Sequence, residues 1–212
     1  MYKLPLFPLN TVLFPGVPIV LHIFEQRYRE MINECISKRK PFGVVLIEDG
    51  DEVGDGAEPR EIGCSADIVN VERLEDGRMN IVAVGRDRFR ILETDNERTF
   101  LQGTVEDFPL KSRVPREKLN DLSNELRGLL ETYVEALQRL SNVQVAWEAL
   151  PDDPTELGYL AAYVLQVVPE QKQEILQLSN AHSLLRRLIT EFRTELSLIK
   201  HIVPTGTIFS LN

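Results

Sequence analysis

The stretch LPLFPLNTVLFPG, residues 4–16, decides how this sequence folds. It is strongly apolar, yet its prolines divide it into pieces that are too short for a helix. Proline is tolerated at sheet edges, bulges and strand ends. The stretch therefore predicts short buried strands, with turns at Asn10-Thr11 and Pro15-Gly16.

The same stretch lacks the features of an export signal. Such a signal has a charged start, an unbroken apolar run of about 7–15 residues and small residues at a cleavage site. Here only Lys3 is charged, the prolines break the run, and no A-x-A pattern follows. No other segment approaches the roughly 18 apolar residues of a membrane-spanning helix. The two cysteines, Cys35 and Cys64, form no C-x-x-C motif and suit a reducing compartment, so we expect a cytoplasmic protein.

The bulk composition is that of an ordinary soluble globular protein. The 212 residues are 43% hydrophobic and 27% charged, enough for one large domain or two modest ones. The formal net charge is -9, which repels phosphate backbones and anionic lipid. The charge therefore disfavours nucleic acids and membrane surfaces as partners.

Residues 1–112 read mainly as strands. One helix interrupts them in EQRYREMINECISKRK, where Tyr28, Met31, Ile32, Cys35 and Ile36 recur at helical spacing. Later, the runs IGCSADIVNVERL and RMNIVAVGRDRFRILE flank the tripeptide EDG, a strong hairpin signal. About six strands, one helix and no βαβ rhythm predict a small, mostly antiparallel barrel or twisted sheet.

Residues 113–212 read as helices. Apolar residues trace one helical face from Leu119 onward, and a last helix is predicted over residues 180–202. Between them, Pro154 and Pro169 mark the starts of two further helices, and Asp152 and Asp153 are available to cap the first. The sequence thus predicts an α+β fold, with a β-rich part followed by an α-helical bundle and a boundary near residue 112.

The chain resembles the amino-terminal domain of Lon proteases along nearly its whole length. In the β-rich part the likeness rests on LPLFPLNTVLFPGVPIVLHIFEQRYREMI, FGVVLIEDG, IGCSADI and DGRMNIVAVGRDRFRI. In the helical part it rests on DDPTELGYLAAYVLQVVPEQKQEILQLSNAHSLLRRL. The family includes stand-alone bacterial proteins, and its barrel module is similar to part of cereblon. The resemblance implies a PUA-like β-barrel packed on a helical bundle.

The resemblance also implies a function. In full-length Lon this region takes part in recognising protein substrates and in assembly, so we expect a module that binds unfolded or degron-bearing protein segments. A Lon-type protease is a further candidate partner, homodimerisation stays open, and no cofactor is expected. The chain has no G-x-x-x-x-G-K-[ST] phosphate loop and no Ser-Lys protease domain, so we expect no enzyme activity. RNA binding through the PUA-like barrel is the alternative.

The block HIFEQRYR, residues 22–29, is the most distinctive polar and aromatic cluster. Its aromatic and basic side chains would line a groove that grips a peptide. Alternatively, Phe24 and Tyr28 fill a strand-to-helix corner that Glu25 caps. The candidate binding residues of the chain are Phe14, His22, Phe24, Arg27, Tyr28 and Arg88.

Three arginines, Arg86, Arg88 and Arg90, alternate along one predicted strand and would share one face of the sheet. Such a stripe would clamp carboxylates of a partner or phosphates of RNA. Alternatively, the arginines pair with acidic neighbours such as Asp87, Glu72 or the loop at residues 48–61. Both interpretations fit the sequence.

No metal site or catalytic nucleophile is expected. The acidic loop at residues 48–61 fails as a calcium loop, because Val53 and Arg60 stand where acids are needed. The histidines and cysteines have no ligand-like spacing (His22, His182, His201, Cys35, Cys64). Both cysteines lie in apolar runs and are expected to be buried and inert.

Overall fold

The computed structural model describes residues 1–50, 57–95, 97–112, 114–141 and 149–202. By their contacts, residues 1–111 and 162–179 form one compact unit, and residues 112–161 and 180–212 form a second. The boundary near residue 112 stays a prediction, since residues 162–179 group with the strands that precede it.

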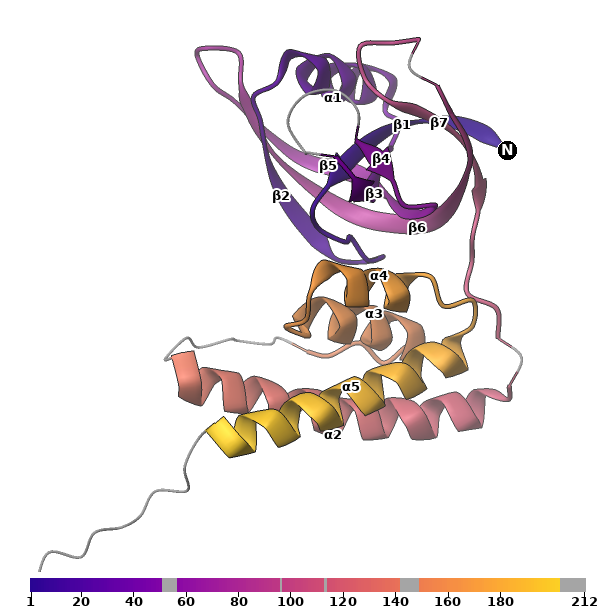
Figure 1. Ribbon diagram of the computed structural model, residues 1–212, viewed down its shortest axis with the longest axis vertical. Helices are drawn as coiled ribbons and strands as arrows, with labels where there is room; N and C mark the ends of the chain where they lie inside the picture. The colour runs from indigo at the N-terminus through magenta and orange to yellow at the C-terminus, as the bar shows by residue number, and fades with distance from the viewer. Residues whose placement is uncertain (51–56, 96, 113, 142–148, 203–212) are drawn as a thin grey trace, which may run out of the picture. The chain divides into compact units, whose positions relative to one another are not determined.

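The first unit is built on one sheet of seven strands (Figure 1). The strands are β1 (Tyr2–Leu9), β2 (Pro18–Ile23), β3 (Phe42–Asp49), β4 (Glu58–Pro59), β5 (Ile62–Arg73), β6 (Met79–Asp95) and β7 (Gln102–Asp107). They pair in the order β1-β7-β6-β5-β3-β4, while β2 pairs with β6, and β1 also pairs with β3. The β1–β3 pairing is parallel and all the others are antiparallel. The prediction of a mostly antiparallel sheet is confirmed.

The opening stretch of the sequence is woven into this sheet. Strand β1 pairs with β7 over its first half and with β3 over its second half. Its apolar side chains help to form a core cluster of Leu4, Leu6, Val45, Phe89 and Val105. The predicted turn before β2 is also present, with Gly16 at a φ of 77°. The prolines therefore shorten the strands without excluding them from the sheet.

In the described part of the chain, α1 (Gln26–Lys38) is the one helix that interrupts the strands, as predicted. Its buried residues are Tyr28, Met31, Ile32 and Cys35, which lie on one helical face. Glu25 makes no side-chain capping bond, so its predicted role as a cap is wrong. Its carboxylate instead accepts a hydrogen bond from Arg27 Nε at 3.0 Å.

The predicted hairpin joins β5 and β6. Leu74 N–H donates to Arg78 O at 2.9 Å, and Gly77 adopts a φ of 81°. Only glycine takes this backbone conformation without strain, which is why the Asp-Gly pair marks the turn.

The helices that follow are α2 (Arg116–Ser141), α3 (Pro154–Val164), α4 (Pro169–Leu176) and α5 (Ala181–Ile202). Helices α2 and α5 pack side by side in the second unit, where the rings of Tyr133 and Phe192 meet edge-on at 5.1 Å (Figure 1). Asp153 caps α3, because its Oδ1 accepts hydrogen bonds from the N–H groups of Thr155 and Glu156. Helix α4 belongs to the first unit and contacts β5, where Gln173 Nε2 donates to Ile62 O at 2.8 Å.

None of the helices in the described part of the chain has the length and apolar character that a bilayer crossing requires.

Candidate functional site

Two hollows in the surface of the first unit meet at Tyr28, and we call them together the Tyr28 groove. The larger has a volume of about 830 Å³ and lies between α1, β4 and the segment that joins β6 to β7. The smaller has a volume of about 180 Å³ and lies between β1, β2 and the start of α1. Both are lined by residues of the block at 22–29.

The smaller hollow is mainly apolar. Val20, His22 and Phe24 alternate along β2 and its end, so their side chains project from the same side of the strand. Val20 is 73% exposed and Phe24 is 50% exposed. In the described part of the chain β2 pairs only with β6, so its other edge is open beside the hollow. An extended apolar segment could therefore contact both side chains and backbone here.

Tyr28 forms the wall shared by the two hollows. Its ring stacks on the ring of Phe7 with centroids 4.0 Å apart, and only 4% of the residue is exposed. The guanidinium of Arg27 lies 4.4 Å above the same ring. The wall is thus held rigidly by packing on both of its sides.

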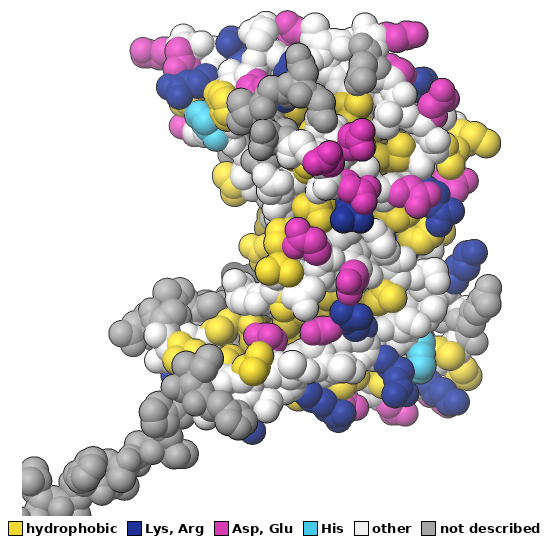
Figure 2. All heavy atoms as spheres, viewed as in Figure 1, with side chains coloured by type: hydrophobic (Ala, Val, Ile, Leu, Met, Phe, Trp, Pro, Cys, Tyr) yellow, Lys and Arg dark blue, Asp and Glu magenta, His cyan; other side chains and the backbone are white. Residues whose placement is uncertain are grey.

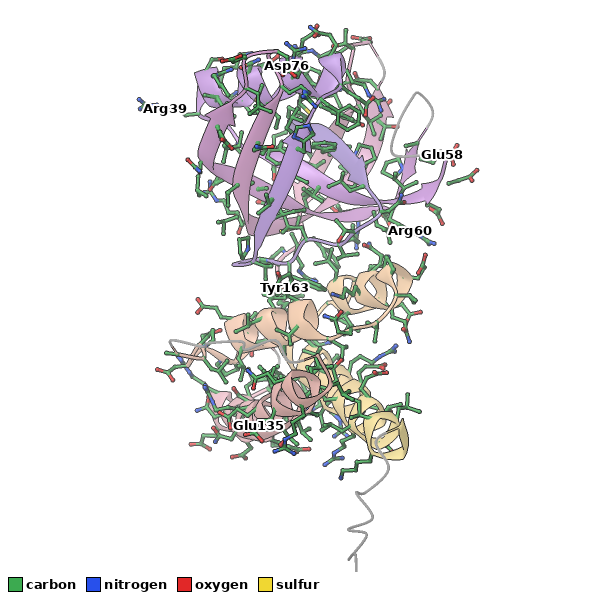
Figure 3. The ribbon with its side chains drawn as sticks, turned by 90° about the vertical axis from the view of Figure 1, so that its left-hand side faces the viewer. Arg39, Glu58, Arg60, Asp76, Glu135 and Tyr163 are labelled. Atoms are coloured by element: carbon green, nitrogen blue, oxygen red, sulfur yellow. The ribbon has the colours of Figure 1, made fainter. Side chains whose placement is uncertain are left out.

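The larger hollow is lined by both polar and apolar residues. Glu30 accepts hydrogen bonds from Gln26 Nε2 and Thr99 Oγ1, each at 2.8 Å. These two bonds lower the pKa of Glu30, so its carboxylate stays ionised at neutral pH. Glu58 also lines this hollow, and Figure 3 shows it on β4. The larger hollow can therefore contact polar and basic groups of a ligand.

The segment that joins β6 to β7 forms the far wall of the Tyr28 groove, and an ion pair connects it to α1. Arg98 Nη1 donates to Glu34 Oε1 at 3.1 Å, and Arg98 Nη2 donates to Glu34 Oε2. The hydrogen bonds from Arg98 and Lys38 lower the pKa of Glu34 to about 2. The same guanidinium lies 4.4 Å over the ring of Phe100. No motif in the sequence links the β6–β7 segment to α1, so the contact that brings Glu30, Arg98, Thr99 and Phe100 to the groove was not predicted.

His22 is held by its neighbours at the rim of the groove. Its Nδ1 lies 2.7 Å from Asn80 Oδ1, and Asn80 Nδ2 donates to Glu72 Oε2 at 2.9 Å. Because the Asn80 oxygen is an acceptor, Nδ1 of the ring is assigned as the donor. The ring is therefore oriented with its Nε2 toward Arg78 Nη1, 3.5 Å away.

Four of the six predicted binding residues line the Tyr28 groove: His22, Phe24, Arg27 and Tyr28. The other two do not. Phe14 is 0% exposed and lies in the core, and Arg88 is 3% exposed. The guanidinium of Arg88 donates to Leu176 O and, at 2.7 Å, to Leu178 O. A partner cannot reach either side chain, so we leave both out of the candidate site.

The predicted stripe of three arginines is wrong, because the three side chains do not share an exposed face. Arg86 is exposed and pairs with Asp67 and Asp87, at 3.5 and 3.2 Å. Arg90 pairs with Glu61 and Glu106, each at 3.4 Å. Between the pairs Cys64–Arg88 and Ala66–Gly85, β6 has one residue more than β5, and this bulge breaks the alternation. Pairing with acidic neighbours was the correct alternative for Arg86 and Arg90.

The cysteines are buried and free, as predicted. Burial raises the pKa of Cys35 to about 11 and that of Cys64 to about 12, so neither forms a nucleophilic thiolate at neutral pH. Among the described residues, no three His, Cys, Asp or Glu side chains gather where they could hold a metal ion. Part of the acidic loop at 48–61 lies outside the described residues.

Comparison with known families decides the identity of the chain. Residues 3–192 match the model of the ATP-dependent protease La (LON) substrate-binding domain. The chain belongs to this LON substrate-binding domain family. The Tyr28 groove is thus a surface hollow in a LON substrate-binding domain.

Curated relatives are Lon proteases. The chain is 26% identical to the Lon protease of Anaeromyxobacter dehalogenans over 176 residues, which cover 82% of this chain and 21% of the relative. It is 29% identical to the Lon protease of Flavobacterium johnsoniae over 159 residues, which cover 74% and 18%. The chain therefore spans about a fifth of the length of these relatives.

Solved structures of Lon N-terminal domains share the fold. A Lon N-terminal domain protein from Xanthomonas campestris matches with a TM-score of 0.64 and 27% identity, covering 90% of this chain and 98% of that one. The N-terminal domain of Mycobacterium avium complex Lon protease matches with a TM-score of 0.68 over 91% and 98% of the two chains. That second pair is 20% identical, so it supports the fold alone.

Proposed function

We propose that this chain is a non-catalytic module that binds exposed, unfolded segments of protein substrates in the Tyr28 groove. The observation that carries this proposal is the pair of exposed apolar side chains, Val20 and Phe24, beside a hollow whose wall is the packed Tyr28 ring. An unfolded protein segment exposes apolar side chains. These can pack on the exposed apolar groups of this chain beside a preformed hollow.

The expected affinity is modest. Burying one leucine-sized side chain contributes about 1.5–3 kcal/mol. Two or three such anchors, less the cost of ordering the segment, give a dissociation constant of roughly micromolar size. Such weak binding suits a module that samples many clients and releases them.

The family supports the wider proposal. Because the matched model is that of a substrate-binding domain, we propose that clients include degron-bearing proteins and that a cytoplasmic Lon-type protease is a partner. For the architecture we propose a PUA-like barrel in the first unit and a helical bundle around α2 and α5. Homodimerisation remains a further proposal, which sedimentation velocity would test.

The test uses a fluorescein-labelled peptide of fifteen residues, rich in leucine and phenylalanine, and a reduced, alkylated protein that cannot refold. We expect fluorescence anisotropy to give binding in the micromolar range for wild-type protein. Phe24→Ser should weaken binding about tenfold, since one apolar contact of about 1.4 kcal/mol is lost.

The matched control is Leu92→Ser, which removes a 46%-exposed apolar side chain of β6 that does not line the groove. This variant should bind the peptide like wild type. Absence of binding by folded, monodisperse wild-type protein at about 1 mM would refute the proposed function. Equal losses of peptide affinity in both variants would instead show that the peptide does not bind in the Tyr28 groove.

A further inference from the structure

A further hollow lies between α1 and β5, on residues that the Tyr28 groove does not use. It has a volume of about 380 Å³. Its walls are the C-terminal end of α1, with Cys35, Ile36, Arg39 and Lys40, and residues 67–71 of β5. We call it the α1–β5 slot.

Strand β5 has an open edge beside this slot. Strand β3 pairs with β5 only over Cys64–Ala66, and among the described residues no strand occupies the same edge over Asp67–Arg73. In an antiparallel sheet, alternate residues turn their N–H and C=O groups away from the partner strand. The edge therefore offers backbone donors and acceptors to an incoming chain.

The path of the chain explains why the edge is open. A strand that continued β3 backward from Phe42 would fill the slot, but the preceding residues turn away into α1. Arg39 makes this turn in the left-handed conformation, with a φ of 52°. Pro41 lacks an N–H group and so cannot donate to the edge.

Side-chain contacts hold α1 beside the far end of the same edge. Arg73 Nη2 donates to Asn33 Oδ1 at 2.9 Å. Arg29 lies against the hairpin tip, where a Cβ on Gly77 would come within 2.2 Å of its Nη2. A helix fixed next to an open strand edge, with a hollow between them, is a geometry that can hold an extended peptide.

The slot has an excess of positive charge. Arg39 and Lys40 are exposed and have no acidic partner among the described residues, and Figure 3 shows Arg39 projecting outward from the end of α1. Asp67, the acidic residue of the slot, pairs with Arg86 at 3.5 Å. The dipole of α1 favours cations at its C-terminus. The position of Arg39 and Lys40 beside the open edge of β5 also makes them available to carboxylates of a ligand.

Apolar side chains complete the slot. Ile36, Ile68 and Val71 line it, and Val69 is 60% exposed beside them. The register between β5 and β6 shifts between Ile68 and Asn70, so Val69 has no partner on β6. This bulge leaves the Val69 side chain free to pack against a bound chain.

We propose that the α1–β5 slot binds an extended, acidic peptide segment, which adds as a strand to the edge of β5. Main-chain hydrogen bonds to β5 supply affinity, and pairing of glutamate or aspartate with Arg39 and Lys40 supplies selectivity. The five residues at 67–71 span about 16 Å, so the slot takes a segment of similar length. This mode differs from the one proposed for the Tyr28 groove, where exposed apolar side chains beside the smaller hollow contact the ligand.

The first test varies the ligand and leaves the protein unchanged. The probe is a fluorescein-labelled octapeptide of alternating threonine and valine with two glutamates, blocked at both ends so that only side-chain carboxylates are present. Replacing both glutamates by lysine should weaken binding about tenfold. Methylating alternate backbone nitrogens should also weaken it about tenfold, since strand pairing needs those N–H groups.

The second test varies the protein. The double variant Arg39→Glu with Lys40→Glu should lose about tenfold in affinity for the acidic probe. The control, Lys111→Glu with Lys118→Glu, changes net charge equally at exposed positions outside the slot and should bind like wild type. Circular dichroism checks that both variants fold.

Three outcomes would overturn the proposal. They are equal affinity for the N-methylated probe, equal losses in the two double variants, and a dimer that blocks the slot and dissociates in the Arg39 and Lys40 variant. The Phe24→Ser variant separates this proposal from the Tyr28 groove, because it should bind the acidic probe normally while losing affinity for the apolar one.

Discussion

Two stretches of the sequence, at residues 22–29 and 86–90, combine aromatic and basic residues in a similar way. The first lines two surface hollows, whereas the middle of the second, at Arg88 and Phe89, is buried. In the first, Phe24 is half exposed; in the second, Phe89 is 0% exposed and Arg88 is 3% exposed. The comparison shows that residue types alone do not separate a binding surface from an interior contact.

The two stretches differ in exposure because different segments pack over them. The end of β2 has an open edge in the described part of the chain, so the side chains that follow it stay at the surface. The middle of β6 lies under the C-terminal end of α4, where the carbonyls of Leu176 and Leu178, 88 and 90 residues further along the chain, accept hydrogen bonds from Arg88. Figure 2 shows acidic, basic and apolar side chains intermixed on the visible face.

The largest effect is expected at Arg88. Replacing Arg88 by alanine removes its bonds to Leu176 O and Leu178 O and leaves two carbonyls without their donor. We expect a loss of about 3–5 kcal/mol in the free energy of unfolding, measured by urea denaturation. Arg86→Ala, on the exposed part of the same strand, should cost less than about 0.5 kcal/mol. Similar costs for both would show that Arg88 is not the interior contact that separates this stretch from the one at 22–29.

A stability measurement on a Tyr28 variant tests whether the wall of the Tyr28 groove is part of the packed core. Tyr28→Ala removes the ring that stacks on Phe7 and supports Arg27. We expect a loss of about 3 kcal/mol in unfolding free energy, since large buried aromatic side chains cost this much when truncated. A loss below about 1 kcal/mol would indicate a wall that is not packed as described.

Unlike Tyr28, Phe24 should contribute little to stability and more to peptide binding. Because its side chain is half exposed, Phe24→Ser should lower the unfolding free energy by less than about 1 kcal/mol while weakening peptide binding. Urea denaturation of this variant, done beside the anisotropy measurement, checks both expectations. A large loss of stability would place Phe24 with Tyr28 as a structural residue.

The smallest effect is expected at Glu34, which ties the groove wall to α1. Hydrogen bonds from Arg98 and Lys38 lower its pKa from the ordinary 4.5 of a glutamate to about 2, so its ion pair stabilises the fold above pH 4.5. This stabilisation is lost as the pH falls from 4.5 toward 2. Glu34→Gln should therefore cost about 0.2–1 kcal/mol at neutral pH and nearly nothing at the acidic end. Thermal unfolding across this pH range checks the difference, which should also shrink in high salt.

Much of the local structure was predictable because its causes lie close together along the chain. The hairpin at Gly77 follows from one dipeptide, and the start of each proline-led helix follows from the missing N–H group of proline, which the first turn does not need. Helix α1 follows from the spacing of its buried residues. The partners of these elements were harder to predict, since Arg98 reaches Glu34 from 64 positions away.

By itself, the sequence determined a mostly antiparallel sheet, the succession of its helices and the block at residues 22–29 as a candidate site. The tertiary structure alone decided that Arg88 is interior, that Glu30 and Arg98 border the groove, and that β5 keeps an open edge. The physical reason is the sequence separation of the residues that interact. Periodicity, turns and proline act over a few residues, whereas burial and ion pairing depend on segments that the folded chain brings together.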